Sequence, residues 1–114
     1  MIEQVTDGTF TQRVLRAPLP VLVEFTASWC PPCRMIAPVL AELAGDLAGR
    51  VEIVALDVDD NPRTAAAAGV LGMPTMSLYV GGEVVAQVVG ARPKAALRSA
   101  IEPHLPVDNS VGAA

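Results

Sequence analysis

The chain has 114 residues, a length that suits a single domain with a substantial hydrophobic core. Hydrophobic residues make up 52% of the chain but aromatic residues only 4%, so we expect a core of mainly aliphatic side chains. The net charge of −4 and the absence of a basic run argue against nucleic-acid binding, which needs a basic face.

The longest apolar stretch, residues 65–80, is interrupted by Gly69, Gly72 and Pro74. These breaks exclude a helix that spans a membrane, and we expect no membrane association. The first residues also lack a basic segment followed by an apolar one, which is the pattern of a signal peptide. The sequence therefore predicts a cytoplasmic protein.

The first part of the chain predicts a short helix and a buried strand. Residues 5–10 indicate the end of a strand followed by a helix cap, and we expect Asp7 to cap a helix that runs to about Arg16. Residues 21–27 are almost continuously apolar, which is typical of a strand covered on both faces. Glu24 is the exception inside this strand.

The rest of the chain alternates between predicted helices and strands. Apolar residues recur at helical spacing over residues 33–47, and a strand is predicted over residues 51–58. Pro62 opens a short helix that Gly69 ends. Residues 75–80 and 83–89 predict a hairpin about two glycines, and a last helix begins near Pro93. This order predicts an α/β fold, a mixed sheet with helices on both faces.

The only two cysteines, Cys30 and Cys33, lie where the predicted strand gives way to the long helix. In a cytoplasmic protein such a pair is more often catalytic or metal-binding than a structural bridge. A closed zinc site generally needs four ligands, but His104 is the only histidine and there is no second cysteine pair. We therefore prefer thiol–disulfide exchange to a metal site, and expect no bound metal or other cofactor.

Within the pair, Cys30 is the expected nucleophile and Cys33 the resolving thiol. The N–H groups of the first helical turn point toward Cys30 and favour its thiolate, whereas Cys33 lies inside the helix and should be less exposed. Pro31 and Pro32 have no N–H, so Cys33 and Arg34 provide the nearest backbone donors to the Cys30 sulfur.

Several short motifs occur in a fixed order along the chain and together resemble the thioredoxin family from about residue 5 to residue 105. They are Trp29-Cys30-Pro31-Pro32-Cys33, Asp59-Asp60-Asn61-Pro62, Gly72-Met73-Pro74-Thr75, Gly81-Gly82-Glu83-Val84 and Val89-Gly90-Ala91. The resemblance implies the thioredoxin fold, a central five-stranded mixed β-sheet flanked by four α-helices. It also implies a domain over residues 1–106 with a flexible tail at 107–114, and a cis peptide bond before Pro74.

The resemblance further implies a monomer that reduces disulfides in protein substrates through a reversible Cys30–Cys33 cycle and is re-reduced by a thioredoxin reductase. Glu24 matches the family's buried aspartate, which moves protons to and from the resolving cysteine. Its apolar neighbours should raise the pKa of its carboxyl group, although a strand-end position facing solvent is the alternative. Ala55 stands where family members often have a lysine partner for that acid.

Pro31 replaces the usual glycine of the family motif, and we expect a stiffer turn with only a modest change in the pKa of Cys30. By the same likeness, one surface around the cysteines docks the substrate, with Trp29 beside the nucleophile or, alternatively, in the core. The expected docking residues are Trp29, Pro31, Val58, Gly72, Met73, Pro74, Val89, Gly90 and Ala91.

Two other functions remain open for a chain of this kind. One is a non-catalytic adaptor of the same fold, whose surface binds a partner whatever the redox state of the cysteines. The other is an oxidising or isomerising disulfide catalyst, which fits the cysteines equally well but would be exported. The acidic run at residues 57–60 is interpreted as caps and a solvated rim, because it lacks the ligand spacing of a calcium loop.

Overall fold

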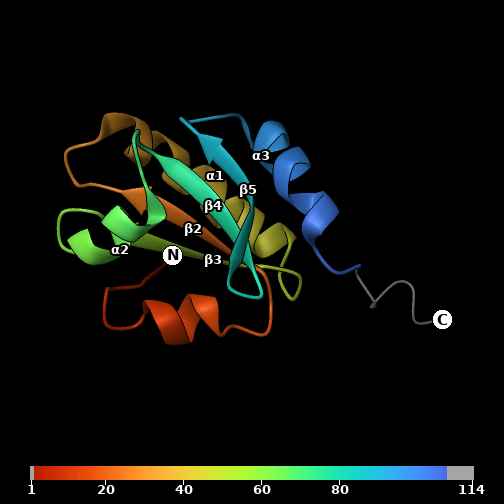
Figure 1. Ribbon diagram of the computed structural model, residues 1–114. Helices are drawn as coiled ribbons and strands as arrows, with labels where there is room; N and C mark the ends of the chain where they lie inside the picture. Colours follow the sequence, from red (N-terminus) through yellow and green to blue (C-terminus); the bar gives the residue numbers. More distant parts are fainter. Residues whose placement is uncertain (1, 108–114) are drawn as a thin grey trace.

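The computed structural model describes residues 2–107 and contains the predicted five-stranded mixed sheet (Figure 1). The strands lie in the order β1-β3-β2-β4-β5. Their bounds are β1 Glu3–Gln4, β2 Val21–Thr26, β3 Glu52–Asp57, β4 Thr75–Val80 and β5 Glu83–Val89. The first three strands in chain order run parallel, whereas β4 pairs antiparallel with β2 and β5 pairs antiparallel with β4.

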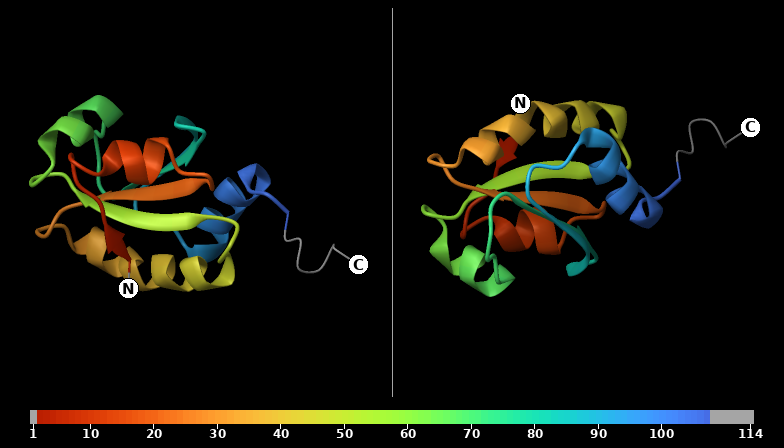
Figure 2. Two further views of the ribbon diagram at one scale, coloured as in Figure 1. Left: turned by 90° about the horizontal axis from the view of Figure 1, so that it is seen from below. Right: turned by 90° about the horizontal axis from the view of Figure 1, so that it is seen from above.

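Helices cover both faces of the sheet, as the sequence predicted (Figure 2). The helix α1 and the helix α3 pack on one face, while the π-helix η1 and the helix α2 lie on the other. A 3-10 turn, η2, follows α3 directly. The bounds are η1 Thr11–Leu15, α1 Pro31–Asp46, α2 Pro62–Ala68, α3 Lys94–Ile101 and η2 Glu102–His104.

No helix within residues 2–107 is long and apolar enough to cross a bilayer. The predicted flexible tail at 107–114 lies outside the described residues except for Val107.

The central strand β2 has two buried faces, which confirms the prediction from its apolar run. Leu22 packs with the residues of α1 and α3, whereas Val23 and Phe25 belong to the apolar cluster on the η1 side. Side chains alternate along a strand, so Glu24 shares the face of Leu22 and its carboxyl group lies on the α1 side of the sheet. Residues 21–25 are all buried, Glu24 included.

The hairpin between β4 and β5 turns on the two predicted glycines. Gly81 and Gly82 have φ angles of 60° and 83°, a left-handed region that glycine enters without steric cost. The backbone of Gly82 also lies close to η1, because a Cβ atom at position 82 would lie 3.1 Å from the carbonyl oxygen of Leu15. A larger residue at position 82 would therefore push η1 away from the hairpin.

The prediction that Asp7 caps the first helix is wrong, because its carboxylate caps α2 instead. Its oxygens accept hydrogen bonds from the Thr64 N–H at 2.8 Å, the Thr64 hydroxyl at 2.6 Å and the Arg63 N–H at 3.3 Å. The Asp7 N–H in turn donates to Oδ1 of Asn61 at 2.8 Å. Asn61 precedes α2 but does not cap it with its own side chain. The first N–H groups of α2 are therefore free to bond to a carboxylate that is far away in the sequence.

Several element boundaries also differ by a few residues from the prediction. The first strand ends at Gln4, although the Val5 N–H still donates to the Ala55 carbonyl oxygen at 2.8 Å. The long helix α1 begins at Pro31, two residues earlier than expected, because proline has a helical φ and the first helical N–H has no partner to lose.

Replacing Asp7 with alanine should lower the melting temperature by several degrees, because α2 loses its capping acceptor. Hydrogen bonds from Thr64 hold the pKa of Asp7 below its usual value of 3.8. The stabilisation is therefore present above that pH and is lost as the pH falls through the lowered pKa. Thermal unfolding of Asp7→Ala at pH 7 and pH 2 measures this, with the exposed Asp60→Ala as a matched control. An equal fall in both variants at pH 7 would contradict the capping role.

Candidate active site

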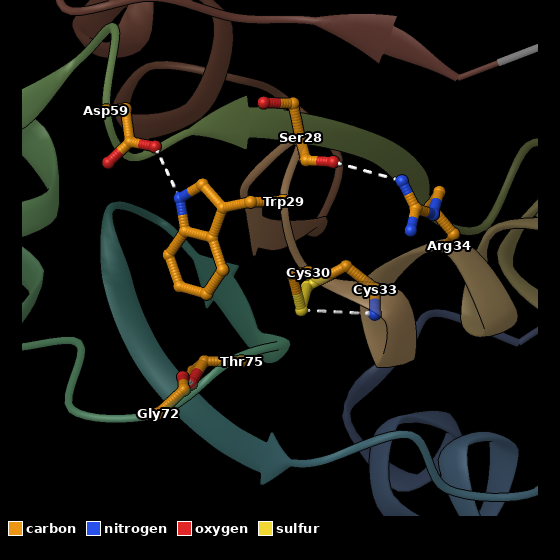
Figure 3. The surroundings of a disulfide bond; sticks show 8 residues. All are labelled: Ser28, Trp29, Cys30, Cys33, Arg34, Asp59, Gly72 and Thr75. Carbon is orange, nitrogen blue, oxygen red and sulfur yellow. Dashed lines mark hydrogen bonds between the residues drawn. A yellow bond between two sulfur atoms is a disulfide. The ribbon is translucent and has the colours of Figure 1, made fainter.

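Cys30 and Cys33 form a disulfide at the start of α1, shortly after β2 ends (Figure 3). Cys30 is the residue just before the helix, and its sulfur accepts a hydrogen bond from the Cys33 N–H at 3.3 Å. Of the two expected backbone donors, only Cys33 bonds to this sulfur; the Arg34 N–H donates to the Cys30 carbonyl oxygen at 3.3 Å. Cys30 therefore sits where the positive end of α1 stabilises a negative sulfur.

The expected difference in exposure between the two cysteines is absent from the disulfide form. Cys30 is 3% exposed and Cys33 is 2% exposed. Both sulfurs share one small apolar cluster with Ala27, and the side chains of Val58 and Met73 pack against it. Assigning the nucleophile thus depends on the helix terminus and not on the burial of either residue.

Trp29 lies on the surface beside the disulfide, so the alternative that it is a core residue is wrong. Its side chain is 62% exposed, yet the indole Nε1–H donates to the Asp59 carboxylate at 2.7 Å. Figure 3 shows this bond joining the loop before α1 to the loop after β3. The large apolar ring is therefore held in one orientation while it faces solvent.

The loop over residues 72–75 faces the disulfide from the other side and contains the expected cis bond between Met73 and Pro74 (Figure 3). The Thr75 hydroxyl donates to the Gly72 carbonyl oxygen, and the Gly90 N–H donates to the Pro74 carbonyl oxygen at 2.8 Å. Within residues 2–107, the backbone N–H and carbonyl of Met73 take part in no backbone hydrogen bond. The loop is thus anchored at both ends, with the backbone N–H and carbonyl of Met73 open to a partner.

The structure brings the other predicted docking residues around the same disulfide. Val58 and Met73 pack against the cluster that contains both sulfurs. Val89 is 49% exposed and ends β5, and the N–H of the next residue, Gly90, donates to the carbonyl oxygen of Pro74. Pro31 and Ala91 are exposed. The predicted set is therefore a partly apolar rim formed by four separate segments.

Sequence reasoning missed Leu71, the most exposed large apolar residue at this rim. Its side chain is fully exposed, and it stands between two small hollows of about 130 and 140 Å³. The first hollow shares Val58 and Met73 with the disulfide cluster, and the second reaches Val89. The loop between Gly69 and Gly72 holds two adjacent apolar residues, of which Val70 packs against the core and Leu71 does not, so no sequence signal singled out Leu71.

Glu24 is buried, which rules out the alternative of a solvent-facing position at a strand end. It is 4% exposed, and its Oε2 is the one buried side-chain polar atom without a hydrogen-bond partner in the described part of the chain. Its neighbours across the sheet are Ala55 on β3 and Met76 on β4, which have no side-chain N–H or O–H to donate. Burial raises the pKa of Glu24 to about 7.

An open groove of about 730 Å³ runs along the edge of the sheet behind Cys33, and Glu24 lines it as well. Glu24 and the second cysteine therefore border the same groove, although both residues are almost fully buried. The side chains that line the groove come from four elements and the segment before α1: Ile2, Gln4, Glu24, Thr26, Ala27, Ser28, Cys33, Arg34, Ala37, Pro38, Ala41, Ala55 and Asp57.

The acidic run at residues 57–60 stabilises the turn at the end of β3, in line with its interpretation as caps. Oδ1 of Asp57 accepts hydrogen bonds from the N–H groups of Asp59 and Asp60 at 2.9 and 3.1 Å. Across residues 2–107, no three histidine, cysteine or acidic side chains are grouped so that they could hold a metal ion.

Comparison with known proteins gives one family. The family model described as Thioredoxin matches residues 1–103. A thioredoxin of Streptomyces clavuligerus is 54% identical over 97 residues, which cover 85% of this chain and 90% of that protein. Thioredoxin 1 of Nostoc sp. is 47% identical over 102 residues, covering 90% and 95%. The thioredoxin of Haemophilus influenzae is 48% identical over 101 residues, covering 89% and 94%. With the disulfide at the start of α1 and the cis-proline loop facing it, the chain belongs to the thioredoxin family.

Proposed function

We propose that this thiol–disulfide oxidoreductase reduces disulfides in partner proteins through a reversible cycle of Cys30 and Cys33. The disulfide at the N-terminus of α1, surrounded by an exposed apolar rim, is the observation that supports the proposal most strongly. In the reduced chain, the Cys30 thiolate attacks one substrate sulfur and forms a mixed disulfide, releasing the other substrate sulfur as a thiolate. Cys33 then attacks Cys30, so the substrate leaves with two electrons and the chain is oxidised.

The nearness of the second thiol contributes more to the rate than a lowered pKa does. A thiol of pKa about 8.5 is about 3% thiolate at pH 7, and a pKa of about 7 raises that fraction roughly 16-fold. The accompanying loss of nucleophilicity is about 5-fold, which leaves a net gain of about 3-fold. Cys30 and Cys33 have Cα atoms only 5.3 Å apart, so the second step is intramolecular and has a high effective concentration.

Glu24 is the proposed proton acceptor for Cys33. A thiol is a poor nucleophile until it loses its proton, and a carboxyl group with a pKa of about 7 can accept that proton near neutral pH. Glu24 and Cys33 line the same open groove, so water in the groove can connect the two groups. In the reverse reaction Glu24 returns the proton to Cys33.

The partner protein is proposed to dock as an extended segment on the loop that contains Pro74. The open peptide group of Met73 can pair with the backbone of such a segment, and Trp29 and Val89 offer apolar contacts on either side. Backbone pairing is independent of sequence, which suits a reductase of many proteins. The proposal also includes a reductase that returns two electrons to the disulfide. Such electrons are supplied in the cytoplasm, which is the proposed location of the chain.

Replacing Cys30 with serine should reduce the rate of insulin disulfide reduction with dithiothreitol to the uncatalysed rate. Cys33→Ser should instead accumulate the mixed disulfide between Cys30 and the substrate, because no second thiol releases it. Mass spectrometry of the quenched reaction distinguishes the two variants. A double serine variant that keeps the full biological activity of the chain would show an adaptor, not a reductase.

Replacing Glu24 with glutamine should slow release of the substrate from the mixed disulfide by about 10-fold or more at pH 7, because Cys33 loses its proton acceptor. The wild-type rate should rise with pH through an inflection near pH 7 as Glu24 ionises, and the variant should lack that inflection. Stopped-flow measurement of the release step between pH 5.5 and 8.5 provides the profile. Glu83→Gln on the exposed hairpin is the control, and an unchanged rate in Glu24→Gln would remove Glu24 from the mechanism.

Glu24→Gln should also stabilise the oxidised protein, but only at higher pH. The folded pKa of Glu24 is about 7 against a usual value of 4.5, so the folded state binds the extra proton between these values. Wild-type stability is complete below pH 4.5 and is lost as the pH rises through 7. The gap between variant and wild type at pH 8 is at most about 3 kcal/mol and is reduced by solvent in the groove. Urea unfolding at pH 4 and pH 8 measures it; a gap that is the same at both values would contradict the burial of a neutral carboxyl.

A further inference from the structure

The groove behind Cys33, with a volume of about 730 Å³, is lined by Glu24, whose Oε2 is the one unpartnered buried side-chain polar atom of the described residues. Glu24 is more than nine-tenths buried, and both it and the groove lie on the α1 side of the sheet. A buried carboxyl oxygen without a donor is costly, and native structures satisfy most such atoms with protein groups, water or a ligand. The neighbouring positions Ala55 and Met76 offer this oxygen no side-chain donor.

The charges that line the groove favour a cation. They are the carboxyl groups of Glu24 on β2 and Asp57 on β3, and the guanidinium of Arg34 on α1. Arg34 is turned to a backbone partner, because its guanidinium donates to the Ser28 carbonyl oxygen at 3.2 Å, as Figure 3 shows. The remaining lining residues from β1, β2 and α1 have no acidic or basic side chain apart from the thiol of Cys33 in the reduced chain.

The walls of the groove suit a short alkyl chain. Ala37, Pro38 and Ala41 line it from the exposed side of α1, and Ala55 lines it from the sheet. These side chains are small and apolar, so a slim hydrocarbon can lie between helix and strand without displacing them. The volume of about 730 Å³ is in the range of small-molecule sites.

We propose that this groove is a binding site for a short primary alkylammonium ion. Its ammonium group donates a hydrogen bond to the carboxyl group of Glu24, and its alkyl chain lies against Ala37, Ala41 and Ala55. A primary ammonium has three N–H donors and one positive charge, which matches an unpartnered carboxylate better than a water molecule does.

Binding of the ion couples to the proton on Glu24. The ammonium favours the carboxylate over the carboxylic acid, so affinity should increase as the pH rises through the titration of Glu24. Well below that range, affinity should fall about tenfold for each pH unit. By linkage, a concentration of ten times Kd should lower the apparent pKa of Glu24 by about one unit. If Glu24 accepts the Cys33 proton as proposed above, the bound ion also lowers the pH range in which Glu24 becomes able to accept that proton.

The test uses the oxidised full chain, n-propylammonium chloride as the probe, and NMR titration of the ¹³C-labelled glutamate carboxyl groups. Glu24→Gln identifies the Glu24 signal. We expect propylammonium at ten times its Kd to lower the apparent pKa of Glu24 by about one unit, and tetramethylammonium, which has the same charge but no N–H donor, to leave it unchanged. An equal decrease with both ions, or a decrease of less than about one unit with propylammonium at 100 mM (roughly ten times a Kd of 10 mM), would overturn the proposal.

Two variants that narrow the groove test the location. Ala55→Leu fills the floor but is at a buried position, so Ala37→Leu on the exposed side of α1 provides a second variant that does not depend on repacking the core. Both should weaken binding at least 5-fold, whereas Ala66→Leu on the exposed side of α2 should leave it unchanged. Undiminished binding in folded Ala37→Leu and Ala55→Leu would place the ion elsewhere and contradict the proposal.

This outcome is independent of the proposed reductase activity. Insulin reduction is measured without any amine and depends on Cys30 and Cys33, whereas ion binding is measured on the disulfide form, in which neither thiol reacts. A chain that reduces insulin but does not bind propylammonium overturns only the ion site. A chain that binds the ion but does not reduce insulin overturns only the reductase.

Discussion

The burial of β2 on both faces is the constraint on which the rest of the molecule depends. The strand pairs with β3 on one side and β4 on the other, and its residues 21–25 exclude solvent. Four residues after the strand ends, Cys30 caps the start of α1, so the disulfide lies close to this well-packed strand. The same packing holds Glu24 away from water and raises its pKa. The proposed roles of Cys30 as nucleophile and Glu24 as proton acceptor thus both depend on how β2 is buried.

The parts of the fold that depend on near neighbours were predictable from the sequence. The cysteine pair, Pro62 at the start of α2 and the glycine pair at the hairpin are local signals, because a turn or a helix start is decided within a few residues. The apolar run of β2 was equally clear, since only a strand between two layers tolerates it.

Features that join distant segments could not be predicted. Asp7 has the residue type and position of a local cap, but the donors it meets are 56 and 57 residues away. Leu71 and its neighbour Val70 look alike in the sequence, and only the fold shows that Val70 packs against the core whereas Leu71 faces solvent. The groove has no sequence signal at all, because it results from small side chains on α1 and β3 that become neighbours only in space.

The hydrogen bonds that Asp7 accepts from the start of α2 affect more than the stability of that helix. The C-terminus of α2 leads through Gly69 directly into Leu71 and the loop before Pro74. The carboxylate of Asp7 therefore fixes the start of the helix that leads into the loop before Pro74, although it touches neither sulfur. Variation in the first ten residues thus has a route to shifting that loop while leaving the disulfide between Cys30 and Cys33 in place.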